Sequence, residues 1–183
     1  MNIFVGSSSR NIECKEFNEL AEKIGNFIVE GKHNYVFGGC IRGLMGTIYE
    51  IVKNTESKII ATSVLSYSDE IECLNKDYPK AIQIVSKNVG ERKNELIHNS
   101  DVMIFIPGGI GTLDELFSSI EAKRAGEHNN PIFIMNINGY YNKLVEMLDN
   151  IYKNKFASPS DSENYKICFS FEELINEINK IDI

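Results

Sequence analysis

The feature that most constrains this chain is a short apolar run that meets a cluster of glycines. Residues 102–106 are five consecutive apolar residues, too few for a helix and typical of a fully buried strand. Pro107 ends that strand because proline lacks an N–H donor and fixes its own φ angle. Gly108, Gly109 and Gly111 then permit a tight turn that lies close to a ligand, since no Cβ intervenes.

A helix is expected after this turn, because Leu116, Phe117 and Ile120 recur on one helical face from Thr112 onward. A strand, a glycine turn and a helix N-terminus together leave backbone N–H groups free to bind a phosphate or another anion. A purely structural interpretation is also open. Thr112-x-x-Glu115 has the form of a capping box, in which Glu115 would accept a hydrogen bond from a backbone N–H.

Length and charge narrow the range of functions. With 183 residues and 43% hydrophobic residues, we expect a single domain over residues 1–183 that contains a sizeable core. The net charge of −7, without any run of basic residues, argues against a nucleic-acid partner. No apolar run is long enough to span a bilayer, so no membrane partner is expected.

The cysteines and the first residues favour a cytoplasmic location. Cys14, Cys40, Cys73 and Cys168 are widely spaced and form no Cys-x-x-Cys pair, which predicts free thiols. No basic segment and no cleavage site precede the first strand. Because His, Asp and Cys residues form no ligand cluster, we expect neither a metal nor another cofactor.

Apolar strands alternate with helical patterns along the whole chain, which predicts an α/β fold with a Rossmann-like, doubly wound parallel sheet. In such sheets the ligand binds at the carboxyl ends of the strands, so the turn that contains Ser7 is a candidate contact. An acidic, irregular connection that contains Glu70 is expected at residues 66–80. The predicted strands are residues 2–5, 35–37, 58–63, 81–85, 102–106, 131–135 and 167–169.

A second glycine-rich turn follows the predicted strand at residues 35–37 and contains Gly38, Gly39, Arg42 and Gly43. It lacks the Lys-Ser/Thr of a P-loop and the Gly-x-Gly-x-x-Gly spacing of a dinucleotide fingerprint, which argues against a nicotinamide oxidoreductase. The Arg42 guanidinium suits an anion, although a lone loop arginine is equally often just solvated.

The string Pro-Gly-Gly-x-Gly-Thr-x-x-Glu at residues 107–115 resembles the signature of the LOG family of cytokinin riboside 5′-monophosphate phosphoribohydrolases. The family is also labelled lysine decarboxylase-like, yet no lysine here stands in a Schiff-base motif for pyridoxal phosphate. Arg92-Lys93 and the Gly-Tyr-Tyr string at residues 139–141 are similar to the family as well, and the resemblance covers nearly the whole chain.

The resemblance implies a homodimeric hydrolase that cleaves the N-glycosidic bond of a nucleoside 5′-monophosphate, with Glu115 and Arg92 as catalytic residues. Arg92 lies 23 residues before Glu115, as in the family; from the residues alone, a surface pair with Glu95 is the alternative, worth about 0.2–0.5 kcal/mol. The candidate substrate-binding residues, from the motifs and the resemblance together, are Ser7, Gly38, Gly39, Arg42, Gly43, Glu70, Lys93, Gly108, Gly109, Gly111 and Thr112.

Cleavage of a base from ribose 5-phosphate builds positive charge on the sugar, and a carboxylate near the anomeric carbon stabilises that charge or activates water. Glu115 is expected in the first turn of its helix, where the helix dipole favours the ionised form by about 0.3–1 kcal/mol. Arg92 is expected to hold the phosphate, to orient Glu115 or to assist departure of the base. The sequence leaves these three roles open.

By resemblance the substrate is AMP or an N6-modified AMP. The chain departs from the family at Cys40, which replaces a glycine, and at Glu121 and Arg124, which replace a threonine and a glutamine. The departures at Glu121 and Arg124 keep a pyrimidine nucleotide such as CMP open as the substrate, whereas Cys40 adds a side chain where the backbone would approach a phosphate. A non-catalytic nucleotide sensor is the other alternative, but such a protein would be expected to lose Glu115 or Arg92.

Overall fold

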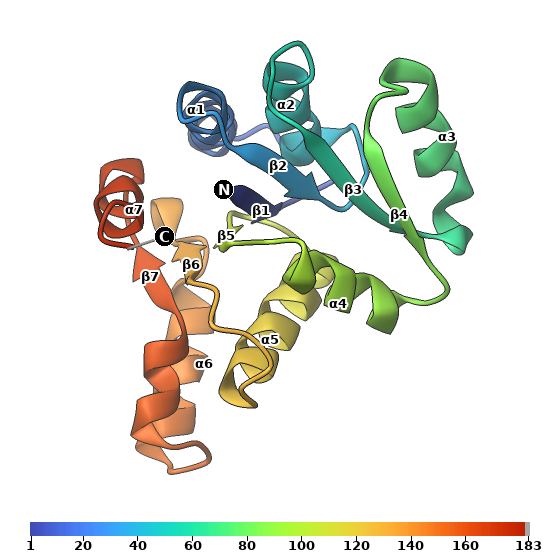
Figure 1. The fold of residues 1–183 in the computed structure, drawn as a ribbon. Coiled ribbons are helices and arrows are strands. Elements are labelled where there is room, and N and C mark those ends of the chain that lie inside the picture. Colours follow the sequence, from blue (N-terminus) through green and yellow to red (C-terminus); the bar gives the residue numbers. More distant parts are fainter. Residues whose placement is uncertain (182–183) are drawn as a thin grey trace.

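Seven parallel strands form one sheet in the order β4-β3-β2-β1-β5-β6-β7 (Figure 1). The computed structural model describes residues 1–181. The Rossmann-like α/β fold predicted from the sequence is thereby confirmed, with β7 at the sheet edge. The strands are β1 (Asn2–Gly6), β2 (Asn34–Phe37), β3 (Ile59–Val64), β4 (Ile82–Ser86), β5 (Val102–Phe105), β6 (Ile132–Met135) and β7 (Lys166–Cys168).

Helices cover both faces of the sheet, with α1, α2, α3 and α7 packed on one face and α4, α5 and α6 on the other (Figure 1). Three short 3₁₀ helices lie in the connections. The helices are α1 (Lys15–Glu30), α2 (Gly43–Val52), α3 (Ser68–Asp77), α4 (Val89–His98), α5 (Ile110–Arg124), α6 (Asn142–Lys153), α7 (Phe171–Ile178), η1 (Leu65–Tyr67), η2 (Ile137–Gly139) and η3 (Pro159–Asn164).

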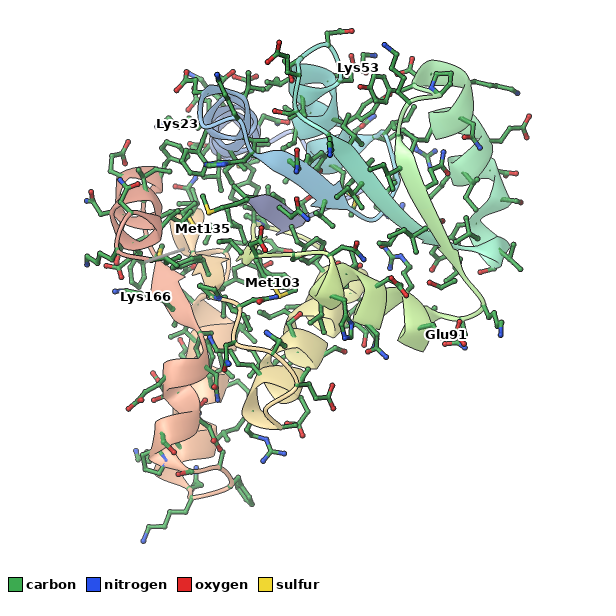
Figure 2. All side chains as sticks on the ribbon, viewed as in Figure 1. Lys23, Lys53, Glu91, Met103, Met135 and Lys166 are labelled. Carbon is green, nitrogen blue, oxygen red and sulfur yellow. The ribbon has the colours of Figure 1, made fainter. Side chains whose placement is uncertain are left out.

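Two apolar cores result, one on each face, because successive side chains of a strand point in opposite directions. Ile3 belongs to the core beneath α1 and α2, whereas Phe4 belongs to the core beneath α4 and α5. Figure 2 shows Met103 and Met135 in the interior, and both are fully buried. A sheet buried on both faces explains why the strands read as continuous apolar runs.

The strand order reverses between β1 and β5, and this reversal determines where a ligand can bind. The chain leaves β1 toward α1 on one face and leaves β5 toward α5 on the other. The two departing connections separate at that point and leave a crevice beyond the carboxyl ends of the strands. The serine-rich and glycine-rich turns identified in the sequence border this crevice.

The irregular connection predicted for residues 66–80 is wrong, because η1 and the ten-residue helix α3 occupy most of that segment. Of the α3 residues only Leu74 is buried, so the segment shows too few apolar positions to reveal a helical period. Its acidic residues Asp69 and Glu70 lie in the first turn, where the helix dipole favours negative charge.

All four cysteines are free thiols, as predicted; Cys40 and Cys168 are buried and Cys73 is exposed. Within the described part of the chain, no helix has both the length and the apolar character needed to cross a bilayer.

The loop after β1 packs against the start of α2 through a glycine. Gly43 has a φ of +63°, and a Cβ at this position would collide with the Arg10 carbonyl and lie 2.7 Å from the Ser8 carbonyl oxygen. Ser8 O also accepts a hydrogen bond from Met45 N at 3.3 Å, and Gly43 N donates to Asn11 Oδ1 at 3.3 Å. Gly43 therefore allows the serine-rich loop to lie against the second glycine turn.

Gly43→Ala is expected to lower the free energy of unfolding by about 2–4 kcal/mol, because left-handed strain and a backbone collision add together. Gly126→Ala is the matched control: Gly126 has a φ of +80°, but a Cβ added there would meet no atom within 4 Å. The control should therefore lose only about 1–2 kcal/mol from strain. Urea unfolding followed by circular dichroism measures both losses, and equal losses would contradict the packing role of Gly43.

Candidate active site at the strand reversal

A cleft of about 390 Å³ opens at the carboxyl ends of β1, β2 and β5. The turn after β1 and the first residues of α5 form two of its walls, while the turn after β2, η1 and single residues of α2, α3 and α4 contribute the rest. Eight of the residues predicted for the site line this cleft. They are Ser7, Gly38, Glu70, Arg92, Gly109, Gly111, Thr112 and Glu115.

Helix α5 begins at Ile110, two residues earlier than predicted, with Gly109 as its N-cap. The first backbone bond of this helix runs from Leu113 N to Gly109 O at 3.1 Å, so the N–H groups of residues 110–112 have no partner within the helix. Thr112 Oγ1 donates instead to Ser7 O, at 3.1 Å. The alternative interpretation of Thr112 and Glu115 as a capping box therefore does not hold, and the free N–H groups border the cleft.

The glycines of this turn have two different functions in the structure. A Cβ on Gly108 would collide with the Thr112 side chain, whereas Gly109 and Gly111 have no atom within 4 Å of a Cβ position. Behind the turn, Tyr140 Oη donates to Gly108 O at 2.6 Å and Tyr141 Oη donates to Ile106 O at 2.8 Å. The side of the turn at Gly108 is thus packed and hydrogen-bonded within the protein, whereas the side at Gly109 and Gly111 is open to a ligand.

Arg92 and Glu115 form a buried ion pair on the floor of the cleft. Arg92 Nη1 lies 3.0 Å from Glu115 Oε1, and the two side chains are only 10% and 6% exposed. Arg92 Nε also donates to Thr62 O at 3.1 Å, and a Cβ on Gly38 would collide with Arg92 Nη2. The structure therefore forms this long-range pair and not the surface pair between Arg92 and Glu95.

Glu115 is the sixth residue of α5, so its predicted place in the first helical turn is wrong. The helix dipole acts mainly within the first turn and contributes little at this position. Burial raises the pKa of Glu115 above its usual value, and the positive charge of Arg92 opposes that rise. A carboxyl group whose pKa lies closer to neutrality is better suited to proton transfer than an ordinary glutamate.

Five of the predicted site residues lie outside the cleft. Lys93 Nζ pairs with Asp114 Oδ1 at 2.7 Å on the side of α4 that faces α5. Arg42 lies at the rim, where Nη2 is 3.7 Å from Glu70 Oε1. Gly39, with a φ of +87°, turns the chain beside β3. Gly43 packs against the loop after β1, and Gly108 packs against the Thr112 side chain.

The cleft also contains residues that the sequence analysis did not select. Arg10 has no carboxylate within 4.0 Å in the described part of the chain, and its guanidinium therefore remains available to an anion. Tyr67 brings an aromatic ring to the wall, and Cys40 brings a thiol. The only sequence signal for Arg10 was its place in the polar turn directly after the first strand.

The remaining polar groups differ in whether they can contact a ligand in the cleft. Ser7 is 2% exposed, and its Oγ has no hydrogen-bond partner within residues 1–181 although it lines the cleft. Glu121 and Arg124 pair with each other at 2.7 Å on the exposed surface of α5, away from the cleft of this chain. No group of three His, Cys, Asp or Glu side chains in the described residues is arranged to hold a metal ion.

The fold and the site define an α/β protein that presents a helix N-terminus and a buried carboxylate–guanidinium pair at its strand reversal. A family model described as "Possible lysine decarboxylase" matches residues 44–178. Cytokinin riboside 5′-monophosphate phosphoribohydrolase LOG5 of Arabidopsis thaliana is 30% identical over 176 residues, which cover 96% of this chain and 75% of the relative. LOG1 of the same plant is 30% identical over 188 residues, covering 96% and 80%. The chain belongs to this family, whose relatives here are named as phosphoribohydrolases.

Solved structures share the fold at lower identity. The molybdenum cofactor carrier protein MCP from Chlamydomonas reinhardtii matches with a TM-score of 0.67 and 16% identity, covering 98% of this chain and 96% of that one. The molybdenum cofactor binding protein from Rippkaea orientalis matches with a TM-score of 0.63 and 18% identity, covering 97% and 93%. At these identities the likeness shows the fold alone.

Arg92→Met is expected to lower the free energy of unfolding by about 3–5 kcal/mol at neutral pH, because it leaves the Glu115 carboxylate buried without a partner. The folded-state pKa of Glu115 should then rise further above the unfolded value. The loss should therefore be small at pH 4, where the carboxyl is largely protonated in both states, and should grow as the pH rises above the unfolded pKa.

Urea unfolding of the variant and the wild type at each pH measures this difference. Arg124→Met removes the arginine of an exposed pair and should cost less than about 1 kcal/mol at any of these pH values. A loss for Arg92→Met that does not depend on pH would show that Glu115 is not the group left unpaired.

Proposed function

We propose that this protein hydrolyses the N-glycosidic bond of a nucleoside 5′-monophosphate and releases the free base and ribose 5-phosphate. The proposed substrate is AMP or an N6-modified AMP, in line with the names of the relatives. The observation that carries the proposal is the buried Arg92–Glu115 pair on the floor of a cleft that the N-terminus of α5 borders.

The 5′-phosphate is proposed to bind at the first turn of α5. The N–H groups of residues 110–112 lack helical partners, and the helix dipole favours a negative charge there. Gly109 and Gly111 leave room for phosphate oxygens, and the unpartnered Ser7 hydroxyl is suitable as a further donor. Arg10 supplies a positive charge in the same cleft.

Glu115 is proposed to act at the anomeric carbon. As the bond from C1′ to the base nitrogen breaks, its electron pair goes to the base and positive charge develops on the ribose. The Glu115 carboxylate stabilises that charge and accepts a proton from the attacking water, whose oxygen forms the new bond to C1′. The departing base takes up one proton from solvent, and Glu115 then releases to solvent the proton it took from water. One water molecule is thereby added across the bond, and the Glu115 carboxylate is regenerated.

Arg92 is proposed to be a positioning residue for Glu115. Its guanidinium is fixed by the Thr62 carbonyl and packs directly against Gly38, so Glu115 has one well-defined partner. Its positive charge also opposes the effect of burial on the pKa of Glu115 and favours the ionised form that the reaction needs.

Cys40 favours CMP as a second candidate substrate. Its side chain lines the cleft where the family motif has a glycine, so this wall leaves less room for a purine. A pyrimidine base is smaller and occupies less of the cleft.

The central test is product analysis after incubation with AMP, CMP, GMP, UMP and isopentenyl-AMP, with the free base resolved by chromatography. We expect one base to be released, and Glu115→Gln to lower kcat by about 10²–10⁴-fold because the general base is lost while the shape is kept. Glu121→Gln, an exposed glutamate on the same helix, serves as the control and should retain wild-type rates. If nucleotides bind but no base is released, the proposed hydrolase activity is wrong and the protein is better described as a nucleotide sensor.

The pH dependence of kcat/KM gives an independent check on Glu115. Burial raises the pKa of Glu115 above the ordinary glutamate value of 4.5, and the proposed reaction uses the ionised form. Activity should therefore fall as the pH is lowered, with a midpoint above 4.5 in the free enzyme. Circular dichroism at each pH separates this loss from unfolding, and a midpoint at or below the ordinary value would argue against a buried catalytic Glu115.

A further inference from the structure

Three of the four arginines of this chain lie at the cleft or its rim, although the net charge of the chain is −7. Arg92 lies at the bottom of the cleft, Arg10 lines its side and Arg42 lies just outside it. The fourth, Arg124, pairs with Glu121 on the surface of α5. Guanidinium groups bind phosphoryl oxygens well because of their planar, multiple donors. The arginine side chains are therefore concentrated where an anionic ligand enters.

Arg10 and Arg42 border a second hollow of about 580 Å³ that adjoins the cleft. Its other lining residues are Ser9, Asn11 and Glu70, so every residue that lines it is polar or charged. Ser9, Arg10 and Glu70 also line the cleft, which makes the two spaces continuous. We call these five residues the rim. Their composition suits an anion better than an aromatic base, because none of the five has an apolar side chain.

The positive charges of the rim are only weakly compensated. Arg42 Nη2 lies 3.7 Å from Glu70 Oε1, which is too long for a hydrogen bond, and the side chains are 70% and 26% exposed. Arg10 has no carboxylate within ion-pair distance among residues 1–181. An incoming phosphoryl group would meet two guanidiniums and compete with a single, loosely placed carboxylate.

We propose that the rim is a second anion subsite that receives a phosphoryl group outside the cleft. Two sources have this chemistry: the second phosphate of a nucleoside 5′-diphosphate whose remaining part lies in the cleft, or a free phosphate ion. Arg10 and Arg42 donate to the phosphoryl oxygens, and the anion displaces Glu70 from Arg42. This subsite goes beyond the proposed hydrolysis because it concerns binding, and its diphosphate form rests on the proposed binding of a nucleotide in the cleft.

Isothermal titration calorimetry with AMP, ADP and inorganic phosphate tests the subsite. All proteins carry Glu115→Gln, so that the nucleotides are not consumed. If the source is a diphosphate, ADP should bind about fivefold more tightly than AMP, and Arg42→Ala should abolish that preference. If the source is free phosphate, a second equivalent of phosphate should bind per chain, and Arg42→Ala should lose it. Arg124→Ala is the matched control and should behave as the parent in both cases.

Glu70→Gln provides a test of opposite sign. Removal of the competing carboxylate should strengthen binding at the rim, and so raise the affinity for ADP relative to AMP or the affinity for the second phosphate. A damaged fold would weaken binding and cannot imitate this gain. Equal affinities for AMP and ADP, together with no phosphate equivalent that depends on Arg42, would overturn the proposal. Because binding and not turnover is measured, this outcome is independent of whether the protein hydrolyses nucleotides.

Discussion

Two opposite charges are buried together on the floor of the cleft, and the elements around them must hold both in place. Removal of an ion from water costs several kcal/mol in a protein interior, and this cost is offset only when the partner and further hydrogen bonds are well placed. Here Arg92 comes from α4 and Glu115 from α5, and the Thr62 carbonyl of β3 accepts a hydrogen bond from Arg92 Nε. A shift of any of these three elements would leave a buried charge unsatisfied, which couples the sheet and two helices to the site.

The same demand explains how the glycine turns are built. Gly38 allows the Arg92 guanidinium to pass directly over the backbone, and Gly108 allows the Thr112 side chain to lie against the turn. These glycines are required by contacts within the protein. Gly109 and Gly111, in contrast, adjoin empty space, so the lack of a side chain there leaves room for something from outside. Glycines that are identical in the sequence thus serve two purposes: some allow close packing within the protein, and others leave space for a ligand.

The fold was predictable because apolar strands and helical periods are local patterns that a parallel sheet requires. The junction of strand, glycine turn and helix at β5 and α5 follows from residues 102–117 alone. The start of α5 was misplaced, since the N-cap is Gly109 in extended backbone and no side-chain signal marks it. Lys93 illustrates a limit of motif reasoning. It follows Arg92 in a helix, and a turn of about 100° per residue prevents both side chains from facing the same cleft. The convergence of Arg92 and Glu115 was inferred from the family resemblance, because without the downstream glycine motif the residues favoured a surface pair between Arg92 and Glu95.

The nature of the floor also distinguishes a functional explanation from a structural one. An apolar pair of similar volume often stabilises a protein as much as a buried ion pair, or more, because no desolvation cost arises. Stability alone therefore gives no reason to bury Arg92 and Glu115 where α4 meets α5. At this position, however, the pair is reached from a cleft that a helix N-terminus borders, and Glu115 is the buried carboxylate that lines it. A charged floor is costly for folding but useful for a reaction in which positive charge develops on the substrate, and this difference supports a catalytic role for Glu115.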